Sequence, residues 1–284
     1  MFGIQLYIIN ILYLCAVFNL NTYKDMKIYE PKGRAREYSP LALNYFKGCT
    51  HNCLYCYVSR MNKAFGVPYT QSECNAPTEL DLREIENSAY KMQGCNKQIL
   101  LQFTSDPYCN MPPEITTKVL KILLKYRHKV VILTKGGNRC LNDIELFKQF
   151  KEKIKVGATL TFDNEKDSLF WESGAALPFE RLESLKTLSE SGIKTWVSFE
   201  PVIVPEQSLN LLEKAAKFVD SVKIGKLNDY KGLDKQINWT DFIERSVEIC
   251  RKNNLQFYIK KDLAKFNKCT QLNSHELDEN YLCL

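Results

Sequence analysis

Seven short apolar runs, separated by stretches with helical periodicity, dominate the sequence from residue 41 onward and restrict it to few folds. Several runs are continuously apolar, as expected for strands buried on both faces of a parallel sheet. Repeated β–α units of this kind predict either an open doubly wound sheet or a full or partial β/α barrel. The runs are Leu41–Phe46, Gln98–Phe103, Val130–Thr134, Val156–Phe162, Thr195–Phe199, Ser221–Gly225 and Leu255–Ile259.

Three of the intervening stretches carry an apolar stripe with spacing near 3.6 residues, which predicts amphipathic helices. They span 115–126, 182–188 and 209–219, and Gly192 is placed to cap the second at its C-terminus. No internal repeat, low-complexity tract or Gly/Ser linker interrupts the pattern. A single domain is therefore predicted.

Polar residues gather where the predicted strands end. Both candidate architectures bind ligands at the carboxyl ends of their strands. One such residue would be an ordinary loop residue, but polar residues at successive strand ends indicate a shared pocket. They are Gly48 to Cys56, Ser105 and Asp106, Thr134 and Lys135, Thr161 and Asp163, Glu200, Lys226 and Asn228, and Lys260 and Lys261.

Three of the eleven cysteines, Cys49, Cys53 and Cys56, fall on one loop after the first predicted strand. The other eight are scattered without a C-x-x-C pair, which favours a reducing compartment over a disulfide-linked secreted protein. Four cysteines saturate an iron–sulfur cluster, whereas three leave one iron open for inner-sphere chemistry. The alternatives are a zinc loop, with His51 or a distant cysteine as fourth ligand, and three unligated core cysteines.

The net charge of +6 permits but does not require an acidic partner such as nucleic acid, and a solvated Lys-rich surface is the favoured interpretation. No dense Arg/Lys arm or aromatic RNA-binding signature accompanies it.

The first twenty residues, Met1–Leu20, are apolar and uncharged, and as a helix they would span roughly 30 Å, about one bilayer core. One interpretation is that translation begins at Met26, which opens directly into the pattern of a soluble protein. The other is a membrane anchor whose C-terminal side stays in the cytoplasm. Both predict a cytoplasmic active domain over residues 26–284, with 1–25 as a separate apolar segment.

The loop Gly48-Cys49-Thr50-His51-Asn52-Cys53-Leu54-Tyr55-Cys56-Tyr57 resembles the radical S-adenosylmethionine (SAM) superfamily, whose signature is C-x-x-x-C-x-Φ-C with an aromatic Φ, here Tyr55. The resemblance implies an α/β fold, a partial (β/α)6-type TIM barrel with parallel strands, and a C-terminal extension from about residue 230. It also implies a [4Fe-4S] cluster whose open iron binds SAM. An electron from a flavodoxin or ferredoxin would then yield a 5′-deoxyadenosyl radical that abstracts hydrogen from substrate.

A narrower resemblance, to the spore photoproduct lyase-like group, covers roughly residues 26 to 230. It implies SAM contacts at the strand ends. The residues on which this resemblance rests are Lys27 to Tyr38, Gly48 to Tyr57, Thr104 to Tyr108, Thr134 and Lys135, Glu172 to Leu182, and Glu200 to Pro205. The implied contacts are Tyr55 near the adenine, Ser105 and Asp106 at the amino group or ribose, Lys135 at the carboxylate, Thr161 at a ribose hydroxyl, and the backbone near Glu200 at the adenine edge.

One departure from that group concerns the substrate. Spore photoproduct lyases carry a hydrogen-donating cysteine at the position of Phe103, and a phenyl C–H bond is too strong to serve. Tyr57 matches the tyrosine beside the last cluster cysteine, and Cys109 is the nearest thiol in sequence, so these two are the candidate catalytic residues. The substrate therefore stays unassigned, with nucleic acid permitted. The competing hypotheses are a non-catalytic zinc or iron–sulfur module and a nucleic-acid-binding protein with a structural cluster.

Overall fold

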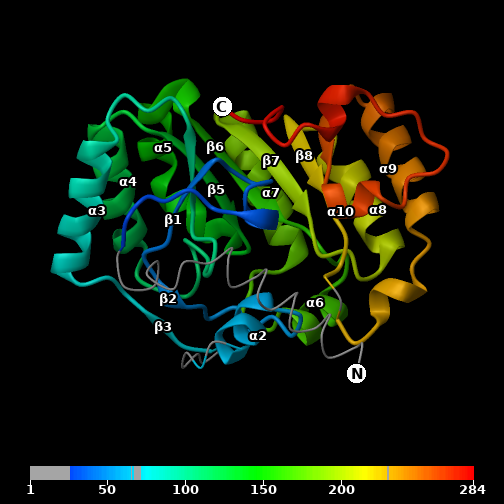
Figure 1. The fold of residues 1–284 in the computed structure, drawn as a ribbon, viewed down its shortest axis with the longest axis horizontal. Coiled ribbons are helices and arrows are strands. Elements are labelled where there is room, and N and C mark those ends of the chain that lie inside the picture. The colour runs from blue at the N-terminus through cyan, green and yellow to red at the C-terminus, as the bar shows by residue number, and fades with distance from the viewer. Residues whose placement is uncertain (1–25, 65, 67–71, 229) are drawn as a thin grey trace.

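The computed structural model describes residues 26–64, 66, 72–228 and 230–284. Its centre is a seven-stranded sheet in which each strand pairs in parallel with the next, in the order β1-β4-β5-β6-β7-β8-β9. Figure 1 shows the sheet running across the molecule, with helices α3 and α4 near one side and α8 and α9 near the other. The strands are β1 (Leu41–Leu43), β4 (Gln98–Leu101), β5 (Lys129–Thr134), β6 (Ile154–Thr159), β7 (Lys194–Phe199), β8 (Ser221–Ile224) and β9 (Gln256–Ile259).

All seven predicted strands form, and the predicted α/β fold with a parallel sheet is confirmed. Every residue of β4 and of β6 is buried, as expected for strands covered on both faces of a parallel sheet. The run predicted over Gln98–Phe103 ends earlier, at Leu101, because Gln102 adopts φ +61° and leaves the extended conformation. The sheet has seven strands, one more than the (β/α)6-type barrel that the resemblance implies. Its last strand, β9, lies beyond residue 230.

The three predicted helices appear as α4, α7 and α8. Each has proline at its start, where the missing N–H costs no intrahelical hydrogen bond. Gly192 follows α7 with φ +77°, as expected of a C-terminal cap. The α-helices are α2 (Tyr57–Ala64), α3 (Glu79–Lys91), α4 (Pro113–Lys125), α5 (Ile144–Phe150), α6 (Glu165–Trp171), α7 (Pro178–Glu190), α8 (Pro205–Ala215), α9 (Trp239–Lys252) and α10 (Lys261–Ala264). Short 3-10 helices cover Gly33–Ala35, Gly137–Asp143, Lys151–Lys153, Leu233–Gln236 and Ser274–Leu277.

One face of the sheet is covered by chain from both ends of the described part. The segment before β1 crosses the sheet in Figure 1, and its Tyr38 packs in one cluster with Leu100, Val131 and Trp196. Leu284 packs against the same cluster, and its backbone N–H donates to Gln98 Oε1 at 2.8 Å. These segments bury the sheet face that the helices leave uncovered.

Residues 1–25, for which the sequence allows either an upstream artefact or an anchor, lie outside the described residues. Within the described residues, no helix is long and apolar enough to cross a bilayer. Met26 itself is 4% exposed and belongs to the hydrophobic core.

Candidate active site at the cysteine loop

The cysteine loop (residues 49–56) starts from a short antiparallel ribbon, in which β2 (Lys47–Gly48) pairs with β3 (Cys74–Asn75). Gly48 has φ +93°, and a Cβ there would lie 2.1 Å from the Glu73 carbonyl oxygen, so only glycine fits. The Cys56 N–H donates to the Cys53 carbonyl at 3.0 Å and closes a turn between these two cysteines. Cys53 is buried, whereas Cys49 and Cys56 are partly exposed.

A segment distant in sequence, Trp171–Gly174, lies along the loop. The Leu54 N–H donates to the Trp171 carbonyl, and the Gly174 N–H donates to the His51 carbonyl, both at 2.9 Å. A Cβ on Gly174 would lie 2.1 Å from the Thr50 carbonyl oxygen. The glycine in this segment therefore permits the close approach of the two backbones.

Glu172, in the middle of that segment, anchors the aromatic position of the loop. The Tyr55 hydroxyl donates to Glu172 Oε1, and Thr161 Oγ1 donates to the same oxygen at 3.2 Å. Arg181 Nη2 lies 2.6 Å from Glu172 Oε2, and both side chains are 1% exposed. Burial by itself would raise the pKa of Glu172, but Arg181 and Lys135 outweigh it and lower the pKa. Glu172 is therefore a charged carboxylate at neutral pH.

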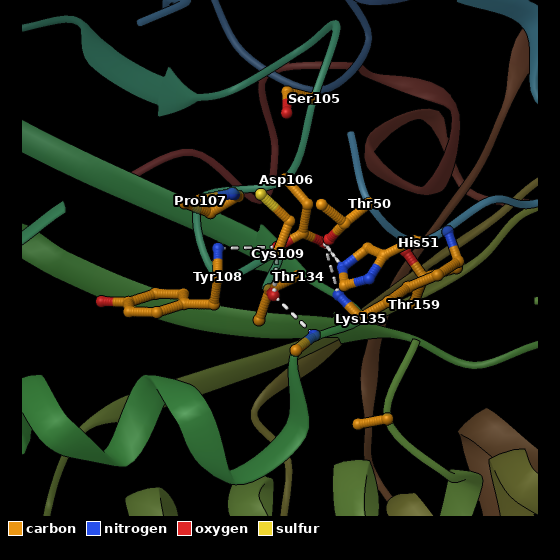
Figure 2. Close-up of polar contacts among 12 residues, drawn as sticks. Thr50, His51, Ser105, Asp106, Pro107, Tyr108, Cys109, Thr134, Lys135 and Thr159 are labelled. Carbon is orange, nitrogen blue, oxygen red and sulfur yellow. Dashed lines mark hydrogen bonds and ion pairs between the residues drawn. The ribbon is translucent and has the colours of Figure 1, made fainter. Parts of the chain in front are cut away.

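Asp106 contacts the cysteine loop at His51, as Figure 2 shows. Its Oδ1 accepts from the Tyr108 N–H at 2.8 Å and Thr134 Oγ1 at 2.6 Å, and its Oδ2 accepts from the Lys135 N–H at 2.7 Å. His51 Nε2, from the cysteine loop, lies 3.1 Å from Oδ2. Burial would raise the pKa of Asp106, but His51 and these hydrogen bonds outweigh it and hold the pKa well below its usual range. One carboxylate thus joins the ends of β4 and β5 to the cysteine loop.

The structure brings most of the predicted SAM-binding residues to the loop. Tyr55 and Thr161 meet at Glu172, and Lys135 Nζ lies 5.7 Å from the centre of the Tyr55 ring. Ser105 Oγ donates to the Gly48 carbonyl, directly before the first cluster cysteine. For Asp106, the contacts above show a positioning residue, because both carboxylate oxygens already accept from protein donors. Its contact with SAM stays a prediction.

Glu200 belongs to a second group of charged side chains, at the ends of β7 and β9. Its carboxylate forms an ion pair with Lys260 and accepts a hydrogen bond from the Tyr38 hydroxyl. Lys260 Nζ lies 4.2 Å from the centre of the Tyr38 ring. Burial and the Glu200 charge raise the pKa of Tyr38. The Glu200 side chain is therefore engaged with Tyr38 and Lys260, and the predicted adenine contact from its backbone is a separate, untested prediction.

The two candidate catalytic residues, Tyr57 and Cys109, have different partners. The Tyr57 hydroxyl donates to the Phe103 carbonyl at 2.6 Å, and the two rings lie 6.4 Å apart. Cys109 is 1% exposed, and its thiol donates to Cys74. Tyr57 thus contacts Phe103, while the Cys109 thiol is directed toward another thiol.

Sequence reasoning assigned no role to the Glu172–Arg181 pair or to Tyr38. It also missed two buried lysines on the covered sheet face. Lys155 and Lys223 lie inside β6 and β8, and charged residues within otherwise buried strands were the available signal. Burial lowers the pKa of Lys155 to about 8 and that of Lys223 to about 7.

The donor set of the loop fits an iron–sulfur cluster. Three free thiols on one loop are the ligands that such clusters take. Burial raises the pKa of Cys53 to about 12, so metal binding must displace its proton. Within the described residues, no three His, Cys, Asp or Glu side chains converge on a point where they would hold a single metal ion.

A parallel sheet with a three-cysteine loop after its first strand is the arrangement of iron–sulfur enzymes that are built on a partial β/α barrel. The family model for the radical SAM superfamily matches residues 43–219. The chain belongs to the radical SAM superfamily of enzymes.

Two curated proteins are similar in sequence to part of this chain. The chain is 27% identical over 172 residues to an uncharacterized protein of the Acidianus two-tailed virus, and the aligned region covers 58% of this chain and 57% of that protein. It is 30% identical over 169 residues to an uncharacterized protein of Methanocaldococcus jannaschii, with 57% and 60% covered. The matches thus span about three fifths of these curated relatives.

Two solved structures share the fold. Streptococcus suis SuiB bound to SAM matches with a TM-score of 0.61 and 15% identity, covering 85% of this chain and 55% of SuiB. A spore photoproduct lyase variant with bound SAM and dinucleoside spore photoproduct matches with a TM-score of 0.54 and 14% identity, covering 78% and 64%. At these identities the likeness extends to the fold alone.

Proposed function

We propose that this enzyme holds a [4Fe-4S] cluster through Cys49, Cys53 and Cys56 and uses it to cleave SAM reductively, so that a 5′-deoxyadenosyl radical abstracts hydrogen from a substrate. The observation that carries the proposal is that two buried carboxylates, Asp106 and Glu172, fix the cysteine loop at two residues, His51 and Tyr55. A loop that only stored a structural metal would not need both anchors at the ligand-binding edge of the sheet.

The bound cluster would supply the electron that breaks a carbon–sulfur bond of SAM. The protein's part is to place SAM and keep it there. Lys135 emerges from the end of β5, beside Tyr55, where a compact cation would pair with the SAM carboxylate. Tyr55 offers a ring face for the adenine, and Thr161 a hydroxyl for the ribose. Ser105 would contact the amino group or the ribose from the loop after β4.

The rigidity of the loop has a direct chemical purpose. Reacting atoms must be held about 3–3.5 Å apart, and a displacement of about 1 Å can reduce the rate about 100-fold. The Glu172–Arg181 pair fixes Tyr55, and Asp106 fixes both His51 and the backbone of Lys135. The two anchors therefore hold the cluster ligands and the proposed SAM contacts in one frame. A flavodoxin- or ferredoxin-type protein would deliver the electron.

The proposed site differs from that of spore photoproduct lyases in one respect. Phe103 occupies the hydrogen-donor position, and its ring packs against Tyr38 and Tyr57 rather than leaving space for another donor. We therefore propose that the enzyme does not complete the repair of thymine dimers. Formation of intact thymines over several turnovers with a lesion-bearing oligonucleotide would contradict this.

The direct test is SAM cleavage. Protein reconstituted anaerobically with iron and sulfide, then given dithionite and SAM, should release 5′-deoxyadenosine. Cys53→Ala should abolish both the cluster and the product. Cys250→Ala is the matched control, since Cys250 is equally buried but lies on α9 in another part of the core, and this variant should retain both. Stoichiometric zinc without iron, or an iron-loaded protein that forms no 5′-deoxyadenosine, would refute the proposal.

A further inference from the structure

Two cysteines outside the cysteine loop lie against each other beside it. Cys74 belongs to β3, where it pairs with Gly48, and Cys109 lies in the loop after β4. The Cys109 thiol donates to Cys74 Sγ across 3.6 Å, although 35 positions separate them in sequence. Both cysteines are free. Neither belongs to the three-cysteine motif, so the cluster does not account for them.

The two sulfur atoms are close enough to bond after a small movement. A disulfide needs a separation of about 2.05 Å, so each sulfur has to move by less than about 1 Å. We propose that Cys74 and Cys109 form a redox-active dithiol that closes to a disulfide by exchange with a small-molecule disulfide. This site is chemically separate from the proposed SAM cleavage.

The unequal exposure of the two thiols sets the order of the exchange. Cys74 is partly exposed, whereas Cys109 is 1% exposed, so a small disulfide meets Cys74 first. The Cys74 thiolate attacks one sulfur of the small disulfide, which releases a thiolate and leaves a mixed disulfide. The Cys109 thiolate then attacks Cys74 Sγ and releases the second small thiolate. The protein loses two protons and two electrons, and the small disulfide becomes two thiols.

A disulfide between Cys74 and Cys109 would also affect the cysteine loop. Ser105 Oγ donates to the Gly48 carbonyl, and the Asn110 N–H donates to Thr50 Oγ1 at 2.8 Å. The loop after β4 therefore already contacts the chain on both sides of Cys49. A Cys74–Cys109 disulfide would add a covalent link between this loop and the β2–β3 ribbon. The cysteine loop would then stay formed when the cluster is absent.

The test incubates the full-length chain, with and without its cluster, in anaerobic glutathione buffers of graded ratio. Free thiols are trapped by acid and alkylation, and peptides are identified by mass spectrometry. We expect a linked peptide containing residues 74 and 109, with the loss of two alkylated thiols. Cys109→Ser should accumulate glutathione on Cys74, and Cys74→Ser should leave Cys109 free. Cys140→Ser, at a buried cysteine elsewhere, should behave like the wild type.

Two results would overturn the proposal. One is wild-type protein in which Cys74 carries glutathione but no linked peptide forms at the most oxidising ratio. The other is linkage of Cys109 to Cys49 as often as to Cys74, which would indicate unspecific scrambling. Because the metal-free chain gives the same readout, the result stands whether or not the protein cleaves SAM. In the linked metal-free protein, amide hydrogen exchange over residues 49–56 should slow several-fold relative to the reduced form.

Discussion

The buried ion pair between Glu172 and Arg181 should be one of the most costly contacts to break in this protein. Glu172→Gln leaves the Arg181 guanidinium buried without a counter-charge, because both side chains are 1% exposed. Removing one partner of a buried pair costs about 3–5 kcal/mol in the free energy of unfolding. We expect the lower half of that range, since Arg181 also donates to the Ala176 and Thr159 carbonyls and keeps those partners.

The assay is urea denaturation of metal-free protein at pH 7, with cluster content measured separately after reconstitution. Glu30→Gln is the matched control, because its pair with Lys97 is 2.8 Å long but exposed, and solvent screening leaves such pairs little net effect on stability. The double variant Glu172→Gln/Arg181→Met removes both charges and should recover part of the loss. A cost for Glu172→Gln no larger than that for Glu30→Gln would refute the anchoring role.

The Glu172 carboxylate also determines how the free energy of unfolding changes with pH. Glu172 has a lowered pKa in the folded protein, despite a burial effect that would raise it, because Arg181 and Lys135 favour its charged form. Its contribution is therefore complete above the pKa of an unfolded glutamate and is lost as the pH falls through the folded-state pKa. The difference in stability between wild type and Glu172→Gln should shrink in acid.

Three further variants test other parts of the account. Gly174→Ala would place a Cβ 2.1 Å from the Thr50 carbonyl oxygen, so cluster content should fall well below that of Gly232→Ala. At Gly232 an alanine strains only its own backbone, at φ +75°, and its Cβ meets nothing within 4 Å. Equal cluster content would contradict the close approach. Lys135→Ala should weaken SAM binding by about 1–3 kcal/mol in calorimetric titration while the cluster survives, and unchanged affinity would remove Lys135 from the SAM site. Burial lowers the pKa of Lys223 to about 7, so above that pH the native state binds fewer protons than the unfolded state. The free energy of unfolding should therefore rise between pH 7 and 9, by up to about 1.4 kcal/mol per pH unit. In Lys223→Met that rise should diminish, and an identical slope by chemical denaturation would contradict it.

The elements that sequence reasoning found are those with a strong local signal. Buried parallel strands such as β1 are apolar throughout, and helices such as α4 repeat their apolar residues at helical spacing. The β2–β3 ribbon has two residues in each strand, too few for any periodic pattern. Helix α3 did leave a signal that went unused, because Thr78 and Asp81 form a capping box at its start.

The candidate site also has some features that the sequence predicts and others that it does not. The spacing of the cysteines and the polar strand ends are local, and they located the loop and most of its neighbours. The contact between Tyr55 and Glu172 joins residues 117 positions apart, and the bond between Tyr38 and Glu200 joins residues 162 positions apart. Such pairings depend on the tertiary path of the chain, so no pattern along one sequence predicts them.

The central claim is that three cysteines hold a [4Fe-4S] cluster with one iron open to SAM. Its most direct test is electron paramagnetic resonance of the dithionite-reduced, anaerobically reconstituted protein, recorded before and after saturation with SAM. A reduced [4Fe-4S] signal whose g values shift on addition of SAM would bear out the open iron, and the signal should be missing in Cys49→Ala. A cluster signal that SAM leaves unchanged, or one that survives in Cys49→Ala, would contradict it.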